Sequence, residues 1–390
     1  MIHPTVLRKG NRVLSGPIRS SCFLPAFLLF FVFIVPLHAE NPLPVRGLCV
    51  QAPSKRGLDR FVQFVDEQLA PRGLNTLVLR FDYNFEYESH PELRGRNPLS
   101  LDDVRKIVNV CREHEIQLIP QVNLLGHQSW AGSLGNLLRV YPQFDETPHV
   151  KMPQDYKWPN PDGLYCKSYC PLHPEVHTVV FDIVDEIVAT CQATAFHAGM
   201  DEVFYIGDDK CPRCRDQDKG ELFADEVTRI RDHLAKNDCK LWIWGDRLID
   251  GKTTGLGMWE AATNGTHGAI GLIPKDVVIC DWHYERASPT PVLFALNGFH
   301  VLTCPWNNPD VSMDHLEQMK WLRQHSNRKL AERFDGVLLT YWSGVDSLID
   351  AYEGSEQASE GNRGAAESLK RLFPLAAEPD APAQQDGQKN

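Results

Sequence analysis

Eight short apolar runs are spaced along the chain, and they constrain its fold more than any other feature. They lie at residues 47–52, 75–83, 117–123, 195–203, 241–248, 276–284, 300–307 and 336–343. Most are near-continuous in Val, Ile and Leu, which is typical of strands buried on both faces. Longer amphipathic stretches separate them, and this alternation predicts an α/β fold with a parallel sheet. Eight such units predict a (β/α)8 TIM barrel rather than an open sheet.

The spacing of apolar residues between these runs predicts the helices. We expect them at 58–69, 101–114, 176–191, 221–234, 291–296 and 313–330, with a last helix at 365–373 that closes the barrel. Ser100 stands where the N-cap of the second helix would be, with Asp103 three residues later. The Gly-rich connection after the fifth run has the weakest helical pattern.

The first 39 residues have the organisation of an export signal. The basic residues before its apolar run, CFLPAFLLFFVFIVPL, are Arg8, Lys9, Arg12 and Arg19. The run is short for a membrane-spanning helix and contains two prolines. We expect a cleaved signal peptide at 1–39, with a retained N-terminal anchor as the alternative. The chain would then be exported, to the periplasm or the medium, and would meet a membrane only through this segment.

The remaining sequence predicts one domain and a tail. We expect a single domain over 40–373, followed by a disordered tail at 374–390 that has little to bury. A long insertion at 128–172 follows the third run and is rich in Pro, Tyr and Trp. Long loops in compact domains are usually functional. This one leaves the face where barrel enzymes place their active sites.

The charge of the chain limits its partners. The net charge is −11, and no basic run occurs beyond the N-terminal segment. Binding to nucleic acid needs clustered Lys and Arg, so the sequence argues against such a partner. A neutral or cationic substrate fits better. The sequence does not indicate an oligomeric state.

Carboxylates, amides and aromatic side chains gather where the predicted strands end. They are Asp82, Tyr83, Asn123, Asp201, Glu202, Trp244, Asp246, Asp281, Trp282, His283, Tyr284, Trp306, Asn307, Tyr341 and Trp342. Aromatic faces stack on the C–H face of a sugar ring, while carboxylates and amides bind its hydroxyl groups. The set therefore predicts a carbohydrate site at one mouth of the barrel. Aromatic residues that only fill the rim of a core are the alternative.

Asp201 and Glu202 are adjacent, and this limits the chemistry they can share. Cleavage of a glycosidic bond needs an acid for the leaving oxygen and a second group that stabilises the positive anomeric carbon. Neighbouring residues do not easily flank the bond from opposite faces. They can work together when the nucleophile is the substrate's own 2-acetamido oxygen. The Asp then orients the acetamido group and the Glu is the general acid.

Several segments resemble glycoside hydrolase family 20, the β-N-acetylhexosaminidases. They are FHAGMDEV at 196–203, IPQVNLLGHQSWA at 119–131 and YWSGVD at 341–346. The resemblance runs in order over roughly 45–345 and is nearest to the hexosaminidase D-like branch, with the catalytic barrel alone. It implies hydrolysis of terminal β-linked GlcNAc or GalNAc with retention and without a cofactor.

The resemblance also implies roles for individual residues. Asp201 would hold the acetamido nitrogen, and Glu202 would be the general acid and base. Trp244 and Trp342 would wall the acetyl methyl, and His127 would lie near the carboxylates, a hydrogen-bonded core histidine being the alternative. The other substrate-binding residues that we expect at the barrel mouth are Asp246, Trp282, Tyr284 and Trp306.

The chain departs from the family pattern at four points. Gln121 stands where the third strand of the family has Glu. The seventh-strand Tyr-x-Asp is absent from CPWNNPD, and we expect Tyr284 to take the part of its Tyr. The Trp-x-Glu after the eighth strand is Trp-Ser-Gly, with Asp346 as a replacement. The first-strand Arg has Lys55 and Arg56 as candidates. These departures leave the recognition of sugar hydroxyls, and so the choice between GlcNAc and GalNAc, open.

Four cysteines lie in loops on the same face as the predicted site. They are Cys166, Cys170, Cys211 and Cys214, spaced as C-x₃-C and C-x₂-C. In an exported chain such pairs favour disulfides, with structural zinc and independent thiols as alternatives. The five cysteines in or beside apolar segments are expected as buried thiols: Cys49, Cys191, Cys239, Cys280 and Cys304.

Three other functions remain open from the sequence. A retaining glycosidase could use Glu202 as acid and Glu260 or Asp281 as nucleophile. A degenerate barrel could bind glycans without cleaving them. A metal-dependent hydrolase would use His127, His197, Asp201 and His283.

Overall fold

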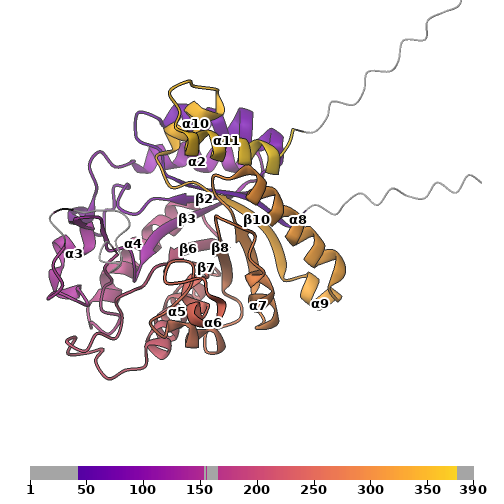
Figure 1. Cartoon of the computed structure of the whole chain (residues 1–390). Helices are drawn as coiled ribbons and strands as arrows, with labels where there is room; N and C mark the ends of the chain where they lie inside the picture. Colours follow the sequence, from indigo (N-terminus) through magenta and orange to yellow (C-terminus); the bar gives the residue numbers. More distant parts are fainter. Residues whose placement is uncertain (1–42, 153–154, 156–165, 376–390) are drawn as a thin grey trace, which may run out of the picture. The chain divides into compact units, whose positions relative to one another are not determined.

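The computed structural model describes residues 43–152, 155 and 166–375 (Figure 1). The expected export signal and all but the start of the expected tail lie outside these residues. Among the described residues, no helix has the length and apolarity needed to cross a membrane.

Eight parallel strands close into a barrel, in the order β1-β10-β9-β8-β7-β6-β3-β2. The strands are β1 (Val45–Gln51), β2 (Thr76–Arg80), β3 (Gln117–Leu124), β6 (Ala195–Gly199), β7 (Lys240–Trp244), β8 (Val278–Trp282), β9 (His300–Cys304) and β10 (Phe334–Thr340). Each falls on one of the eight apolar runs, and the predicted barrel is confirmed. The closing pair, β1 and β10, is parallel like the others, with Leu48 beside Leu339.

Several strands are shorter than the runs that predicted them. The run at 195–203 leaves the sheet after Gly199, and the run at 241–248 leaves it after Trp244 and continues as a 3₁₀ turn at Asp246–Leu248. Asp201, Glu202 and Asp246 are therefore loop residues just beyond the strands. Their backbone is free to adopt conformations that a strand does not allow.

Helices surround the barrel, as Figure 1 shows. The longer ones are α1 (Leu58–Phe64), α2 (Leu101–Glu113), α4 (Val176–Cys191), α5 (Lys219–Ala235), α7 (Thr290–Leu296), α8 (Pro309–His325), α10 (Val345–Tyr352) and α11 (Glu360–Leu372). The predicted cap of α2 is confirmed, because the Ser100 side chain accepts from the N–H of Asp103 and the Asp103 carboxylate accepts from Ser100.

Two helix predictions need correction, and one helix was missed. The helix expected at 58–69 becomes a π-helix at Val65–Leu69, just before Pro71, whose ring and missing N–H oppose regular α-helical bonding. The helix expected at 313–330 is two helices, α8 and α9 (Arg328–Ala331), because Asn327 caps a new start. Helix α10 was not predicted.

The described part of the insertion after β3 has local structure of its own. It holds the short hairpin of β4 (Ser129–Trp130) and β5 (Ser133–Leu134), followed by α3 (Asn136–Val140). Buried Lys167 binds the carbonyl oxygens of Thr147 and Val150, which fastens two parts of the insertion together.

The interior of the barrel is a separate apolar cluster from the layer between strands and helices. Its buried members come from successive strands: Cys49, Val78, Ile119, Ala195, Trp242, Trp244, Val278, Cys280, Trp282, Leu302, Cys304 and Leu338. Side chains alternate between the two faces of a strand, so Cys49 lies in this cluster while Leu48 and Val50 lie in the outer layer. This alternation points Trp244 and Trp282 into the mouth of the barrel.

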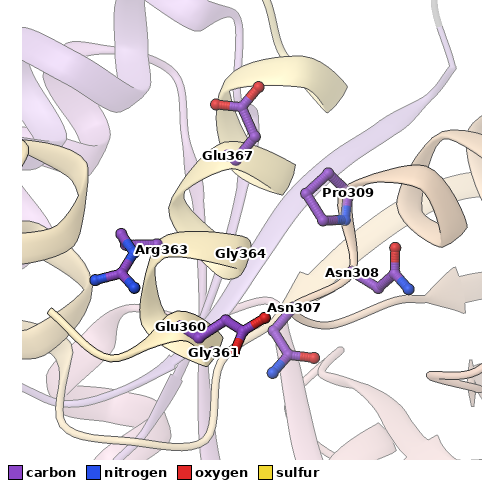
Figure 2. Close-up of a pocket in the computed structure, with 8 residues that line it drawn as sticks. All are labelled: Asn307, Asn308, Pro309, Glu360, Gly361, Arg363, Gly364 and Glu367. Atoms are coloured by element: carbon purple, nitrogen blue, oxygen red, sulfur yellow. The ribbon is translucent and has the colours of Figure 1, made fainter.

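Helix α11 packs closely on the loop after β9, and a pocket of about 610 Å³ lies between them. Figure 2 shows its lining, which includes Asn307, Glu360 and Arg363. A Cβ on Gly364 would lie 2.1 Å from the Asn307 carbonyl oxygen, so this contact requires glycine. Of the residues expected at the barrel mouth, Asn307 lines this pocket, while Asp201, Glu202 and the aromatic residues do not.

Candidate active site

The backbone after β6 turns sharply and presents two neighbouring carboxylates. Gly199, Met200 and Glu202 have φ values of 68°, 69° and 50°. Left-handed conformations at non-glycine residues are costly and persist only where the surroundings enforce them. Gly199 is required for a second reason, since a Cβ there would lie 2.4 Å from the Asn123 side-chain oxygen. The turn separates the Asp201 and Glu202 side chains from the strand and holds both at the mouth of the barrel.

His127 bridges the two carboxylates. Its Nε2 lies 3.0 Å from the Asp201 Oδ2 and 3.3 Å from the Glu202 Oε2. His127 also has a positive φ, of 52°, and its backbone N–H points at the Cys166 sulfur, 3.1 Å away. The sequence placed His127 near the carboxylates, and the structure brings the three side chains together.

The charges of His127 and Asp201 stabilise each other. Burial lowers the pKa of His127, but the charges and hydrogen bonds of Asp201 and Cys166 together outweigh burial and raise that pKa well above its usual value. Burial raises the pKa of Asp201, and the charge and hydrogen bond of His127 reverse that effect and lower it. At neutral pH the pair is therefore an imidazolium beside an ionised carboxylate.

One oxygen of Asp201 is left for a ligand. Asp201 is 7% exposed, and its Oδ1 has no hydrogen-bond partner among the described residues. A buried carboxylate oxygen without a donor is costly, because the desolvation of its charge is not compensated. The position is suited to a donor that arrives with a substrate, such as an amide N–H.

Asp246 supports the backbone of this pair. Its Oδ2 accepts from the Glu202 N–H at 2.9 Å and from the Arg247 Nε at 2.6 Å, and its Oδ1 accepts from the Trp282 Nε1 at 3.3 Å. Burial raises the pKa of Asp246 to about 6, although the Arg247 charge opposes the rise. Asp246 is 1% exposed, and these contacts position Glu202 and Trp282.

Aromatic side chains at the ends of four strands, β7, β8, β9 and β10, form a wall beside the carboxylates. Trp244 and Trp342 have ring centroids 5.6 Å apart, and the Trp342 Nε1 donates to the Tyr284 hydroxyl oxygen at 2.8 Å. Tyr284 stacks on Trp282 at 5.1 Å and meets Trp306 edge-on at 5.3 Å. The five aromatic residues expected to bind substrate thus form one continuous group.

Two residues of this region were not among those predicted. The Arg80 guanidinium lies 4.7 Å from the centre of the Trp342 ring, and its Nε has no hydrogen-bond partner among the described residues. Trp130 is 61% exposed in the β4–β5 hairpin, and its ring stacks near that of His127 at 6.3 Å. Arg80 is the last residue of β2, so it could have been predicted if basic residues at strand ends had been included. Trp130 could have been predicted from the aromatic residues of the insertion.

The two candidates for a sugar-binding arginine on the first strand lie elsewhere. Lys55 is exposed and pairs with Glu86 and Asp103. The Asp346 carboxylate lies against Gly57, where a Cβ would come within 2.3 Å of its oxygen. Gln121 is buried, and its side-chain amide donates to the Asn123 side-chain oxygen.

The grouping of the four loop cysteines needs correction. The structure separates Cys166 from the other three, because it lies beside His127 and Glu202. The Cys170 sulfur lies 3.3 Å from that of Cys214 and 3.7 Å from that of Cys211, and no disulfide joins them. The extended chain from 166 to 170 carries the two cysteines to different sites. The five cysteines expected as buried thiols are buried and free.

The residues proposed for the rival enzymes do not assemble. Asp281 and Glu260 both pair with His283, at 3.2 and 2.8 Å, and Asp281 is 1% exposed. In the described part of the chain, the side chains placed closely enough to hold a metal form two groups, and neither contains His197 or His283. Burial lowers the pKa of His197 to about 3, so it is a neutral core histidine against Trp244.

Comparisons with known proteins agree with this geometry. The family described as "Glycosyl hydrolase family 20, catalytic domain" matches residues 83–344, which is more than half of the chain. Hexosaminidase D of Bos taurus is 22% identical over 298 residues, covering 70% of this chain and 77% of the bovine protein. A β-hexosaminidase of Emericella nidulans is 24% identical over 273 residues, covering 64% of this chain and 41% of the fungal protein.

A solved structure shares the fold. The chitobiase of Flavobacterium johnsoniae superposes with a TM-score of 0.60 at 16% identity, over 85% of this chain. This chain spans about half of the chitobiase, 48% of its length. At this identity the likeness concerns the fold alone, whereas the family match extends over the third to eighth strands and includes both carboxylates. The chain therefore belongs to glycosyl hydrolase family 20.

Proposed function

We propose that this chain is a β-N-acetylhexosaminidase that hydrolyses terminal β-linked N-acetylhexosamine with retention, through attack by the substrate's own acetamido oxygen. The observation that carries the proposal is the buried, unpartnered Oδ1 of Asp201 beside Glu202 and next to an aromatic wall. An acetamido group offers both parts that such a place requires, an N–H donor and an apolar methyl.

In the first step the acetamido carbonyl oxygen forms a bond to the anomeric carbon as the glycosidic C–O bond breaks. Glu202 donates its proton to the leaving oxygen, and the acetamido group becomes a positively charged oxazolinium ring. Asp201 accepts the acetamido N–H and stabilises the charge that develops on that nitrogen. In the second step Glu202 takes a proton from water, which attacks the anomeric carbon and reopens the ring.

His127 keeps Asp201 in the charge state that the first step requires. As an imidazolium within 3.3 Å of both carboxylates, it favours the ionised form of Asp201. Its contact with Glu202 also fixes the orientation of the proton donor. Because His127 reaches the substrate only through the carboxylates, we assign it a positioning role.

The aromatic wall supplies the pocket for the acetyl group. Trp244 and Trp342 present apolar surface, and Tyr284 accepts from Trp342, which leaves the Tyr284 O–H to donate to the acetamido carbonyl oxygen. Such a donor holds the carbonyl oxygen in line with the anomeric carbon. Tyr284 thereby takes the part of the Tyr that the seventh strand lacks.

The test is hydrolysis of the 4-nitrophenyl β-glycosides of GlcNAc, GalNAc and glucose by the purified chain, beside Glu202→Gln and the surface control Glu285→Gln. We expect turnover of the two acetamido sugars, lost in Glu202→Gln and kept in Glu285→Gln. Equal turnover of the glucoside would point to an enzymic nucleophile and reject the mechanism. Binding of all three without turnover would support the glycan-binding barrel instead.

We further propose that the chain is exported through its N-terminal segment, with residues 1–39 removed as a signal peptide. The basic and apolar organisation of that segment supports this proposal. N-terminal sequencing of the protein from fractionated cells tests it. A mature chain that begins near Glu40 is expected, and an intact N-terminus in the membrane fraction would indicate the retained anchor.

A further inference from the structure

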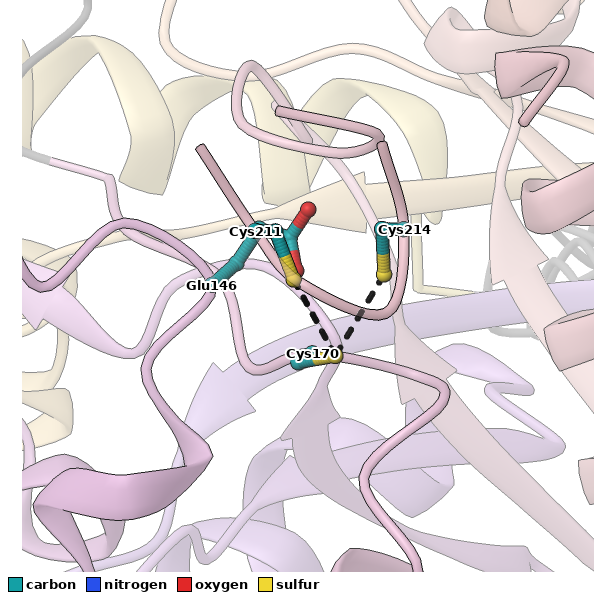
Figure 3. A group of neighbouring side chains, drawn as sticks. All are labelled: Glu146, Cys170, Cys211 and Cys214. Atoms are coloured by element: carbon teal, nitrogen blue, oxygen red, sulfur yellow. Dashed lines mark hydrogen bonds between the residues drawn. The ribbon is translucent and has the colours of Figure 1, made fainter. Parts of the chain in front are cut away.

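Three segments that are distant in the sequence bring three cysteines and one glutamate together near the active site. Figure 3 shows Glu146, Cys170, Cys211 and Cys214 around a common point. One ligand atom from each lies within 4.8 Å of the other three, and all four residues are buried. The catalytic proposal uses none of them.

The spacing of the sulfurs suits one metal ion. Zinc bound tetrahedrally has Zn–S bonds of about 2.3 Å, which places neighbouring sulfurs about 3.8 Å apart. The Cys170 sulfur lies 3.7 Å from that of Cys211 and 3.3 Å from that of Cys214. Small movements of the side chains would bring all three to this geometry.

Glu146 is the second, independent observation. It is fully buried, its Oε1 accepts from the Asp208 N–H at 3.0 Å, and its Oε2 has no hydrogen-bond partner among the described residues. A buried carboxylate needs a counter-charge or several donors. The groups that surround this oxygen are thiols, which are weak donors. A metal cation would bind the carboxylate and the three sulfurs together.

The turn that carries two of the cysteines is already shaped for a thiolate. The backbone N–H groups of Arg213 and Cys214 hydrogen-bond to the Cys211 sulfur. Such N–H groups reduce the negative charge on a metal-bound sulfur. The Cys-x₂-Cys spacing lets one tight turn supply two neighbouring corners of a tetrahedron.

We propose that Cys170, Cys211, Cys214 and Glu146 bind one structural Zn²⁺. Four protein ligands close a tetrahedral site and leave no position for substrate or water, so the ion has no part in the chemistry. A disulfide would join only two of the three sulfurs. It would leave the third thiol and the Glu146 carboxylate buried together without a counter-charge.

The position of the site indicates which segments the ion would hold together. It joins the insertion after β3, which carries Glu146 and Cys170, to the loop that follows Glu202 and carries Cys211 and Cys214. Cys166 lies four residues before Cys170 and contacts the His127 backbone. Given the proposed function, the zinc therefore helps to hold His127 against the catalytic carboxylates.

The test measures zinc per chain by plasma mass spectrometry on the full-length protein, dialysed against metal-free buffer. The double variant Cys211→Ser/Cys214→Ser is compared with Cys239→Ser, which removes a buried thiol outside the cluster. We expect one zinc per chain in the wild type and in Cys239→Ser, and loss of zinc from the double variant. Glu146→Gln should bind zinc more weakly than the wild type in competition with a chelator.

A second measurement does not depend on the folding of any variant. Replacement of the ion in the wild type by Co²⁺ should give thiolate-to-metal charge-transfer absorption and the intense visible bands of tetrahedral cobalt. A wild-type chain without metal, with a Cys170–Cys214 disulfide in its peptide map, would overturn the proposal, as would full zinc content in the double variant. Metal content is read without any substrate, so failure of the proposed glycosidase activity would not be mistaken for failure of this inference.

Discussion

At the residue scale, the site depends on one carboxylate pair and on the side chains that fix its charge. His127 contacts the pair through the two carboxylates, and Asp246 contacts it through the Glu202 backbone. The sequence identified Asp201 and Glu202 from their place after an apolar strand. It could not show that His127 bridges both, because that contact depends on left-handed backbone at His127 and Glu202.

The role of Glu202 as proton donor predicts a dependence on the leaving group. Removal of a general acid typically lowers the rate by about 10²–10⁴. We expect Glu202→Gln to slow the first step most with an alkyl β-GlcNAc, whose leaving oxygen needs a proton. The first step should be slowed least with a dinitrophenyl β-GlcNAc. Single-turnover release of the leaving group measures this difference. Equal losses on both substrates would show that Glu202 is not the acid.

The role of His127 predicts a change in pH dependence. The charge of His127 lowers the pKa of Asp201, so its removal should let burial raise that pKa. In His127→Asn, Asp201 would lose its charge at a higher pH, and the acid limb of the kcat/KM profile should move upward. The profile is measured on 4-nitrophenyl β-GlcNAc. An acid limb that stays at the wild-type pH would remove His127 from this role.

At the element scale, the strand runs were readable because buried parallel strands are apolar throughout, and each run fell on a strand. The structure of the loops was harder to predict from the sequence. Glu146 is one of four acidic residues in the insertion at 128–172, and nothing near it in the sequence relates it to cysteines about 25 and 65 residues away. The separation of Cys166 from Cys170 has the same origin, since an extended segment carries neighbours in the sequence to different sites.

Helix α11 offers a matched pair of glycines. In a helix, Gly to Ala is otherwise stabilising by about 0.5–1 kcal/mol. A Cβ on Gly364 would meet backbone oxygen at 2.1 Å, whereas one on Gly361 would meet only the movable end of the Asn307 side chain at 3.0 Å. Forced overpacking costs about 1–3 kcal/mol. We expect Gly364→Ala to lower the free energy of unfolding and Gly361→Ala to leave it unchanged or raise it.

Urea unfolding of both variants beside the wild type measures this difference. The two substitutions add the same methyl group to the same helix, so propensity cancels in the comparison. Equal effects would show that α11 does not pack on the Asn307 carbonyl as closely as described.

At the scale of the whole molecule, residues from many strands converge on one mouth of a closed barrel, and the predicted closure made that convergence foreseeable. The sequence could not show which of the polar residues have a structural role. Asp281, Glu260 and His283 are candidates by position, but they pair with one another, with Asp281 and His283 buried, and join β8 to the loop after β7.

That group predicts how stability depends on pH. Burial lowers the pKa of His283, but Asp281 and Glu260 outweigh it and raise the pKa to about 10. Because the folded state holds the proton more tightly, the stabilisation is fully present below the unfolded-state pKa of about 6.5. It is lost as the pH rises through about 10.

We therefore expect the Tm of the wild type to fall between these two pH values by more than that of His283→Gln. The exposed control His325→Gln should follow the wild type. Parallel Tm curves for His283→Gln and the wild type would show that His283 is not held as an imidazolium.

The central claim is that the substrate's acetamido oxygen attacks the anomeric carbon, and fluorination of the acetyl methyl tests it most directly. The measurement is kcat/KM for 4-nitrophenyl β-GlcNAc analogues whose methyl carries none to three fluorines, with Kd on Glu202→Gln as the control for fit. Fluorine withdraws electrons from the carbonyl oxygen, so we expect kcat/KM to fall steeply with each fluorine while Kd changes little. A value of kcat/KM that does not depend on fluorination would mean that a group of the enzyme attacks instead, and would contradict the role given to Asp201.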